Sequence, residues 1–131
     1  HEAKLAKQDV VTVWGSGTPF REFLHVDDMA SASVYVMHLE KTIYDQHTSP
    51  MQAHINVGSG REVSIGELAK LVGKAVGFEG EIEFDPSKPD GPPRKLMNSE
   101  RLNSLGWTPE IDLEEGLSKT YKIFLEIEKV S

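Results

Sequence analysis

Two pairs of residues in this sequence have side chains suited to holding a planar, anionic ligand. Trp14 and Arg21 flank a glycine-containing turn that follows a short β-branched run, and Arg94 and Lys95 end a proline-rich loop. An indole stacks on a base or lines a sugar pocket, an arginine fork fits phosphate oxygens, and a lysine adds a point charge. These types indicate a site for a phosphorylated ligand. The alternatives are that the cations are solvated surface groups and that Trp14 is a core aromatic.

The usual patterns of catalytic and cofactor sites are missing from the sequence. Gly58-Ser59-Gly60 is followed by Val63 where a dinucleotide-binding turn needs a third glycine, and no Gly-Lys-Ser/Thr follows Gly15-Ser16-Gly17. No tyrosine has a lysine four positions later, no Gly-x-Ser-x-Gly is present, and no histidine pair has metal-ligand spacing. His25 is therefore expected to be structural, as is Trp107, which follows a helix stop. The pattern favours the binding part of a protein over its catalytic part.

Composition narrows the class further. The 131 residues, 38% apolar and 27% charged, are typical of one globular domain or a piece of one. A formal net charge of −7 argues against a nucleic-acid or anionic-membrane surface. Without cysteine, neither a disulfide nor a thiolate metal site forms, and no apolar run approaches the ~20 residues that span a bilayer. These features predict a soluble, cytoplasmic protein that binds neither nucleic acid nor membrane.

Hydrophobic periodicity predicts strands that alternate with helices. Short apolar or alternating runs predict strands at residues 10–13, 23–26, 54–57 and 81–84. Helical spacing predicts helices at residues 29–43, 65–76, 98–105 and 112–125. Asp27 or Asp28 would cap the first helix, a Ser64/Glu67 capping box would open the second, and Gly77 would end it. The sequence predicts an α/β fold with short parallel strands and about four helices.

The chain also has features of a segment. It begins with His1 in a polar stretch typical of the end of a helix. A parallel sheet needs both faces covered, and the predicted strand at 54–57 lacks a neighbour. We expect a preceding domain to supply that neighbour.

Several blocks of the sequence resemble the C-terminal part of the extended short-chain dehydrogenase/reductases, the NAD-dependent epimerase/dehydratase family. The Arg-Glu-Phe-x-His-Val-Asp-Asp block at 21–28 is typical of that superfamily. The Trp-Gly-Ser-Gly-Thr-Pro block at 14–19 and the Ser-Lys-Pro-Asp-Gly-x-Pro-Arg-Lys block at 87–95 are similar to the branch of GDP-L-fucose synthases. The resemblance covers essentially the whole chain, with further matches at 54–60, 105–107 and 116–121.

The resemblance implies that residues 1–131 are the small C-terminal nucleotide-sugar-binding domain of a two-domain, homodimeric enzyme. An absent N-terminal Rossmann domain would bind NADP and carry the Ser/Tyr/Lys catalytic set with the epimerisation Cys and His. Trp14 and Arg21 match substrate-contacting positions, Lys95 matches a diphosphate contact, and Arg94 is an adjacent candidate. Asn98 stands where the superfamily usually has Asp, and either residue caps a helix.

The expected function is the GDP-sugar-binding part of an NADPH-dependent epimerase/reductase that converts GDP-4-keto-6-deoxy-D-mannose to GDP-L-fucose. The segment alone would be inactive, since it holds no catalytic, cofactor-binding or metal-binding residue. The alternatives are a related nucleotide-sugar epimerase/dehydratase and a non-catalytic nucleotide-sugar-binding module of the same fold. A Gly-x-x-Gly-x-x-Gly turn and a Tyr-x-x-x-Lys motif ahead of His1 would favour the enzyme.

Overall fold

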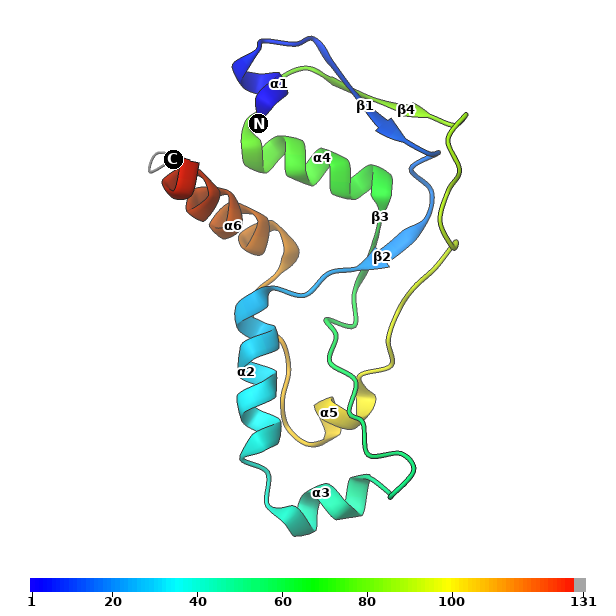
Figure 1. Ribbon diagram of the computed structural model, residues 1–131, viewed down its shortest axis with the longest axis vertical. Helices are drawn as coiled ribbons and strands as arrows, with labels where there is room; N and C mark the ends of the chain where they lie inside the picture. Colours follow the sequence, from blue (N-terminus) through cyan, green and yellow to red (C-terminus); the bar gives the residue numbers. More distant parts are fainter. Residues whose placement is uncertain (129–131) are drawn as a thin grey trace. The chain divides into compact units, whose positions relative to one another are not determined.

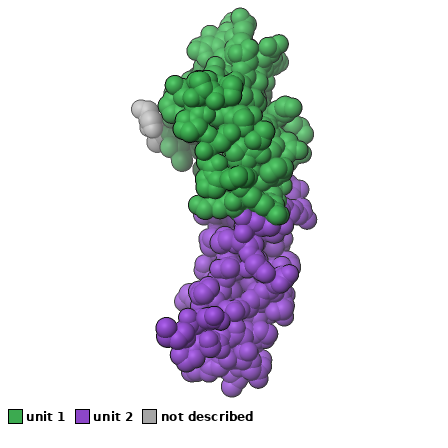
Figure 2. Space-filling view, turned by 90° about the vertical axis from the view of Figure 1, so that its right-hand side faces the viewer, with its two compact units in different colours: residues 1–21, 62–95, 113–131 green, residues 22–61, 96–112 purple. Residues whose placement is uncertain are grey.

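The computed structural model describes residues 1–128 and divides the chain into two compact units, which Figure 2 colours separately. Unit 1 comprises residues 1–21, 62–95 and 113–131, and unit 2 comprises residues 22–61 and 96–112. Each unit is therefore assembled from segments far apart in the sequence. Among the described residues the chain forms six helices and four strands.

Unit 1 contains a parallel pair of strands, which Figure 1 shows above α4. Strand β1 (Val10–Trp14) pairs with β4 (Glu81–Asp85) in a register that runs from Val10 opposite Glu81 to Trp14 opposite Asp85. Because parallel strands end at the same edge, the segments that follow Trp14 and Asp85 leave the sheet together. The predicted strands at 10–13 and 81–84 and their parallel pairing are confirmed.

The helices of unit 1 follow the local signals in the sequence. Helix α4 (Ile65–Val76) opens on a Ser64/Glu67 capping box and ends at Gly77, whose φ of 71° lies in the left-handed region. It packs against α6 (Leu113–Glu128). The unit also contains the short helix α1 (Glu2–Leu5), strand β3 (Glu62–Ser64) and the first two residues of its partner β2 (Phe20–Glu22).

Unit 2 is built from three helices and the segments between them: α2 (Val26–Met37), α3 (Lys41–His47) and α5 (Glu100–Ser104). Ala32, Leu102 and Trp107 form its buried core. The indole N–H of Trp107 donates to the Ser31 hydroxyl at 2.9 Å. The structural role predicted for Trp107 is confirmed, since only 6% of its surface is exposed.

Helix α2 leaves an apolar face uncovered among the described residues. Val26, Val34 and Met37 are 70%, 55% and 81% exposed, and Met29 is 43% exposed. The pairs Val26/Met29 and Val34/Met37 are each three residues apart, and the two pairs are eight residues apart, so all four side chains lie toward one side of the helix. The opposite side carries the buried Asp28 and Ala32. A globular protein seldom exposes a contiguous apolar face of this kind unless another surface covers it.

Two predicted strands are wrong. Residues 23–26 form no strand: the strand here is β2 at Phe20–Glu22, and α2 has already begun at Val26. Residues 54–57 also form no strand, and their backbone makes no hydrogen bond to any backbone group of residues 1–128. Both runs have the composition of strands, but a strand also needs a neighbour to pair with.

The predicted helix at 29–43 is two helices, because the chain breaks between Met37 and Lys41. Its cap is His25, whose Nδ1 accepts from the backbone N–H of Asp27, in place of the predicted aspartates. The Asp28 carboxylate is buried and accepts from the backbone N–H groups of Glu110 and Ile111 at 3.1 and 3.0 Å. Asp28 therefore joins the segment after Trp107 to α2 within unit 2.

Candidate functional site

Trp14 projects from the end of β1 into solvent, with 75% of its surface exposed. Residues alternate between the two faces of a strand, and Val11 and Val13 occupy the half-buried face. The alternative that Trp14 is a core aromatic is therefore wrong. The ammonium of Lys88 lies 5.6 Å from the centroid of the indole ring, within the range of a cation–π interaction.

The glycine turn after Trp14 is tightly packed on both sides. Gly15 and Gly17 have φ values of 92° and 76°, a backbone region that other residues rarely adopt. A Cβ at Gly15 would lie 2.4 Å from Oδ1 of Asp90, and one at Gly17 would lie 2.7 Å from the ring of Phe84. Both positions therefore require glycine for conformation, Gly17 also requires it for space, and at Gly15 a side chain would displace the Asp90 carboxylate.

The proline-rich loop is fastened to this turn by hydrogen bonds. The backbone N–H of Ser16 donates to Oδ1 of Asp90 at 2.9 Å, and the Ser16 hydroxyl donates to Oδ2 at 2.6 Å. The two hydrogen bonds hold the pKa of the Asp90 carboxyl below its usual value. The backbone N–H of Phe20 donates to the Pro93 carbonyl at 2.8 Å. The two cation-bearing segments that the sequence singled out are thus neighbours in unit 1.

Arg21 reaches the same loop from β2. Its Nη1 donates to the carbonyl oxygens of Phe20 and Pro92 at 2.6 and 2.8 Å. A Cβ at Gly91 would lie 2.8 Å from Nη2, so the loop approaches the guanidinium closely. Within residues 1–128, Nε and Nη2 of Arg21 have no hydrogen-bond acceptor of their own. Arg21 both supports the loop and retains donors for a ligand.

Arg94 and Lys95 are adjacent but differ in their surroundings. Nε of Arg94 donates to both carboxylate oxygens of Glu62 at 2.8 and 2.7 Å. This pairing lowers the pKa of Glu62 and raises that of Arg94. Lys95 is exposed and has no hydrogen bond or ion pair with any of the described residues. An anionic ligand would therefore meet the full charge of Lys95, whereas Glu62 offsets that of Arg94.

The sequence analysis missed four residues of this arrangement: Ser16, Glu62, Lys88 and Asp90. Asp90 and Ser16 lie 74 positions apart, and Arg94 and Glu62 lie 32 apart. No local pattern reveals such pairs. A usable signal was the charged Lys88 and Asp90 within a loop whose prolines leave it little freedom.

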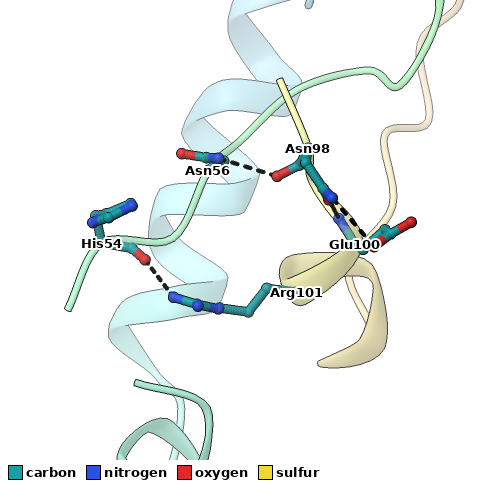
Figure 3. A pocket seen from close by; sticks show the side chains of 5 residues that line it. All are labelled: His54, Asn56, Asn98, Glu100 and Arg101. Atoms are coloured by element: carbon teal, nitrogen blue, oxygen red, sulfur yellow. Dashed lines mark hydrogen bonds between the residues drawn. The ribbon is translucent and has the colours of Figure 1, made fainter. Parts of the chain in front are cut away.

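Unit 2 has a separate, polar hollow of about 330 Å³, lined by His54, Asn56, Asn98, Glu100 and Arg101 (Figure 3). Nη1 of Arg101 donates to the His54 carbonyl at 2.9 Å, and the Asn56 amide donates to the Asn98 carbonyl at 3.1 Å. Oδ1 of Asn98 accepts from the Glu100 N–H at 2.8 Å and so supports the start of α5, but the N-cap position is occupied by Ser99 and not by the predicted Asn98. These polar groups largely satisfy one another.

No group of three or more metal-ligating side chains occurs among residues 1–128. In the same part of the chain, no helix is long and apolar enough to cross a membrane.

The chain is similar to a known protein family and to several solved structures. Residues 2–58 match the model of the NAD dependent epimerase/dehydratase family. Solved structures agree: a GDP-L-fucose synthetase from Naegleria fowleri bound to NADP is 26% identical, with a TM-score of 0.82 over 99% of this chain. A GDP-6-OMe-4-keto-L-xylo-heptose reductase from C. jejuni is 35% identical, with a TM-score of 0.81 over 91% of this chain. Residues 2–58 are therefore similar to that family, and the solved structures that the chain resembles include enzymes that act on GDP-sugars by name.

Within that family the chain resembles GDP-L-fucose synthase. It is 56% identical over 126 residues to the GDP-L-fucose synthase of Escherichia coli (strain K12), a match that covers 96% of this chain. The resemblance stated from the sequence blocks is confirmed. The chain spans 39% of the length of that enzyme, 38% of the Naegleria protein and 34% of the Campylobacter protein.

Proposed function

We propose that residues 1–131 form the nucleotide-sugar-binding domain of a two-domain enzyme that uses NADPH to convert GDP-4-keto-6-deoxy-D-mannose to GDP-L-fucose. The observation that carries the proposal is the indole of Trp14, which is 75% exposed at a sheet edge beside a loop that bears Lys88, Arg94 and Lys95. The 56% identity to the Escherichia coli enzyme supports the choice of substrate.

The proposed roles follow from the chemistry of each side chain. Trp14 offers a flat apolar surface to the base or sugar, Arg21 has Nε and Nη2 to donate to phosphate oxygens, and Lys95 adds an uncompensated charge for the diphosphate. Arg94 is the weaker diphosphate contact because Glu62 already occupies its fork. Binding energy at these remote groups would orient the sugar for chemistry carried out elsewhere in the polypeptide.

The cofactor would be held outside this segment, since its second glycine turn does not fit a dinucleotide. The N–H of Gly60 already donates to the Glu22 carboxylate at 2.7 Å, and a Cβ at Gly58 would lie 2.6 Å from the same group. An anionic side chain thus stands where a pyrophosphate would need free amide donors. Bound by the preceding domain, NADPH would supply the hydride for reduction of the 4-keto group.

The preceding domain is the partner proposed for two features of unit 2. One is the apolar face of α2, where Val26 and Met37 are 70% and 81% exposed. The other is the segment at 54–57, whose backbone groups have no backbone partners among the described residues. The relatives have about three-fifths of their length beyond this match, which is enough for a Rossmann domain. A homodimeric, cytoplasmic enzyme completes the proposal, on the basis of the resemblance.

The test begins with the complete polypeptide that contains this segment. Purified protein is incubated with NADPH and GDP-4-keto-6-deoxy-D-mannose, and the sugar nucleotides are separated by chromatography. The expected result is GDP-L-fucose with equimolar oxidation of NADPH. The Trp14→Ala and Lys95→Ala variants should raise the KM for the GDP-sugar and leave the KM for NADPH unchanged.

A related GDP-sugar reductase is the second candidate, favoured by the 35% identity to the Campylobacter heptose reductase. Oxidation of NADPH with a GDP-4-keto-heptose, and not with the 6-deoxy-mannose substrate, would replace the first proposal with this one. Binding of GDP-sugars with no turnover of either would indicate a non-catalytic module.

A further inference from the structure

We propose that Asp90 is a positioning residue of the nucleotide-sugar site. Its carboxylate joins the turn that begins after Trp14 to the loop that carries Lys88 and Lys95, and so fixes the indole and the two ammonium groups relative to one another. This inference rests on the proposed function of Trp14 and Lys95.

The contact between Asp90 and Ser16 uses both carboxylate oxygens. Oδ1 accepts from the Ser16 N–H at 2.9 Å, and Oδ2 accepts from the Ser16 hydroxyl at 2.6 Å. A two-point contact restrains orientation as well as distance, and hydrogen bonds to an ionised acceptor are stronger than neutral ones. Both residues are exposed or half-exposed, so the contact adds little to a core and its effect falls on local geometry.

The turn is shaped to let Asp90 approach. Gly15 is buried, and any side chain there would stand 2.4 Å from Oδ1 of Asp90. On its other side, the N–H of Gly15 donates to the Asp85 carbonyl at 2.9 Å. The turn is therefore held at the sheet edge by Asp85 and at the loop by Asp90, on both sides of the residue that follows Trp14.

Lys88 shows what this arrangement achieves. Its ammonium lies 5.6 Å from the centroid of the Trp14 ring, two residues before Asp90 on the same loop. The cation therefore stands over the indole, and a planar ligand group would stack on the rest of the exposed ring. The start of this loop is also held at the end of β4, where the Lys88 N–H donates to the Asp85 carbonyl at 3.2 Å and Ser87 donates to Oδ1 of Asp85. Among the described residues, the contact between Asp90 and Ser16 alone joins residues 86–91 to the turn itself, so its loss would loosen the placement of Lys88 beside the indole.

The partner of Asp90 also matters for charge. Within residues 1–128 Asp90 has no ion pair, since its acceptors are filled by the neutral Ser16. Lys88 and Lys95 consequently keep their charge for an anionic ligand, in contrast to Arg94, which Glu62 neutralises. A lysine or arginine in place of Ser16 would fasten the loop equally well but would pair with Asp90.

The experiment uses the complete enzyme and the variants Asp90→Ala, Ser16→Ala and the double variant. Each single substitution should raise the KM for the GDP-sugar about tenfold, the loss expected for charge-assisted hydrogen bonds, with kcat and the KM for NADPH unchanged and Tm lowered only slightly. The double variant should be no worse than either single one, because the two residues act through one contact. Glu79→Ala, at an exposed carboxylate remote from the turn, serves as the matched control.

A second double-mutant cycle tests whether Asp90 acts through the indole of Trp14. In a Trp14→Ala background, Asp90→Ala should raise the KM for the GDP-sugar further by less than about twofold, because the group it positions is gone. Additive effects of Ser16→Ala and Asp90→Ala, equal losses of GDP-sugar and NADPH binding, or an unchanged KM would overturn the positioning role. If Asp90→Ala proved unstable, Asp90→Asn, which keeps one oxygen acceptor, and Ser16→Ala carry the same test.

Different results would exclude the proposed binding site and the role of Asp90 within it. If Trp14→Ala and Lys95→Ala leave the KM for the GDP-sugar unchanged, the proposed binding site itself is wrong. If they raise it and Asp90→Ala does not, the site stands and Asp90 has no part in it.

Discussion

The chain contains two Gly-Ser-Gly turns that look alike in sequence and differ in structure. In unit 1, Gly15-Ser16-Gly17 is closed by the Asp90 carboxylate, and in unit 2, Gly58-Ser59-Gly60 is closed by the Glu22 carboxylate. The first turn carries an exposed tryptophan at its start and a lysine-bearing loop beside it. The second turn leads into β3 and has neither a tryptophan at its start nor a lysine-bearing loop beside it among the described residues. The same three residues thus have different surroundings, which is why we propose a role in recognition for the first turn and a role in local structure for the second.

The difference lies in what surrounds each glycine. Gly15 and Gly17 both have a positive φ, and at Gly17 the Phe84 ring also leaves no space for a side chain. Gly60 has a φ of 70° but nothing within 4 Å of a Cβ, and Gly58 is crowded only by the Glu22 side chain. The first turn should therefore be the more sensitive to substitution.

The largest effect is expected for Gly17→Ala compared with Gly60→Ala. At Gly17 the methyl group would meet the Phe84 ring at 2.7 Å as well as a strained backbone, which should cost about 3 kcal/mol of unfolding free energy. At Gly60 only the left-handed backbone is penalised, by about 1 kcal/mol. Denaturant unfolding of both variants gives the two values. Equal losses would show that packing does not distinguish the turns.

Next in size is the contrast between the two arginines of unit 1. Arg21→Ala should raise the KM for the GDP-sugar about a hundredfold, because it removes donors to the diphosphate and a support of the loop. Arg94→Ala should have an effect of threefold or less, roughly, since Glu62 already neutralises that guanidinium. Initial rates at varied substrate measure both. A larger effect at Arg94 than at Arg21 would reverse the assignment of the diphosphate contact.

Removal of the carboxylate from the second turn should change stability and leave recognition intact. Glu22→Ala takes the acceptor from the backbone N–H groups of Gly60 and Met97, at a cost of about 1–2 kcal/mol. Thermal unfolding and the KM for the GDP-sugar are measured on the same preparation. A lowered Tm with an unchanged KM is the expected result, opposite to that for Asp90→Ala. A raised KM would show that the second turn also belongs to the ligand site.

The smallest effect concerns protonation of the first turn. The pKa of Asp90 is lowered from its usual 3.8 by its hydrogen bonds to Ser16, so the ionised carboxylate stabilises the fold. That contribution is fully present above about pH 3.8 and is lost as the pH falls through the lowered pKa. The Tm difference between the protein and its Ser16→Ala variant should stay constant from about pH 7 to pH 5 and shrink in more acid solution. Growth of the difference in acid would contradict the shift.

The sequence predicted the elements whose signals are local. Helix α4 begins and ends where the Ser64/Glu67 capping box and Gly77 placed it, because each of these residues acts within one helical turn. Strands β1 and β4 were also predicted, together with their parallel pairing. The runs at 23–26 and 54–57 were mistaken for strands because composition reports preference and not the presence of a partner. The break between α2 and α3 contains neither glycine nor proline, so periodicity alone did not reveal it.

The candidate site was predicted in the same partial way. Trp14, Arg21, Arg94 and Lys95 were singled out because their side chains suit a phosphorylated ligand, and their role in binding one remains a prediction. The exposure of Trp14 and the pairing of Arg94 with Glu62 required the fold. Asp90 and Lys88 were missed since their importance arises from contacts with residues 74 positions away or with the ring of Trp14.

The pairing of Trp14 with Asp85 at the end of the parallel ladder has a consequence for how this site can change over evolutionary time. Side chains of a strand point alternately to its two faces, so deletion of one residue between Val10 and Val13 would turn the indole inward and bring a valine outward. Substitutions at residues 10–13 would preserve the proposed site, whereas a single insertion or deletion there would erase it. The number of residues in β1 therefore determines where the proposed ligand contact lies as much as the identity of Trp14 does.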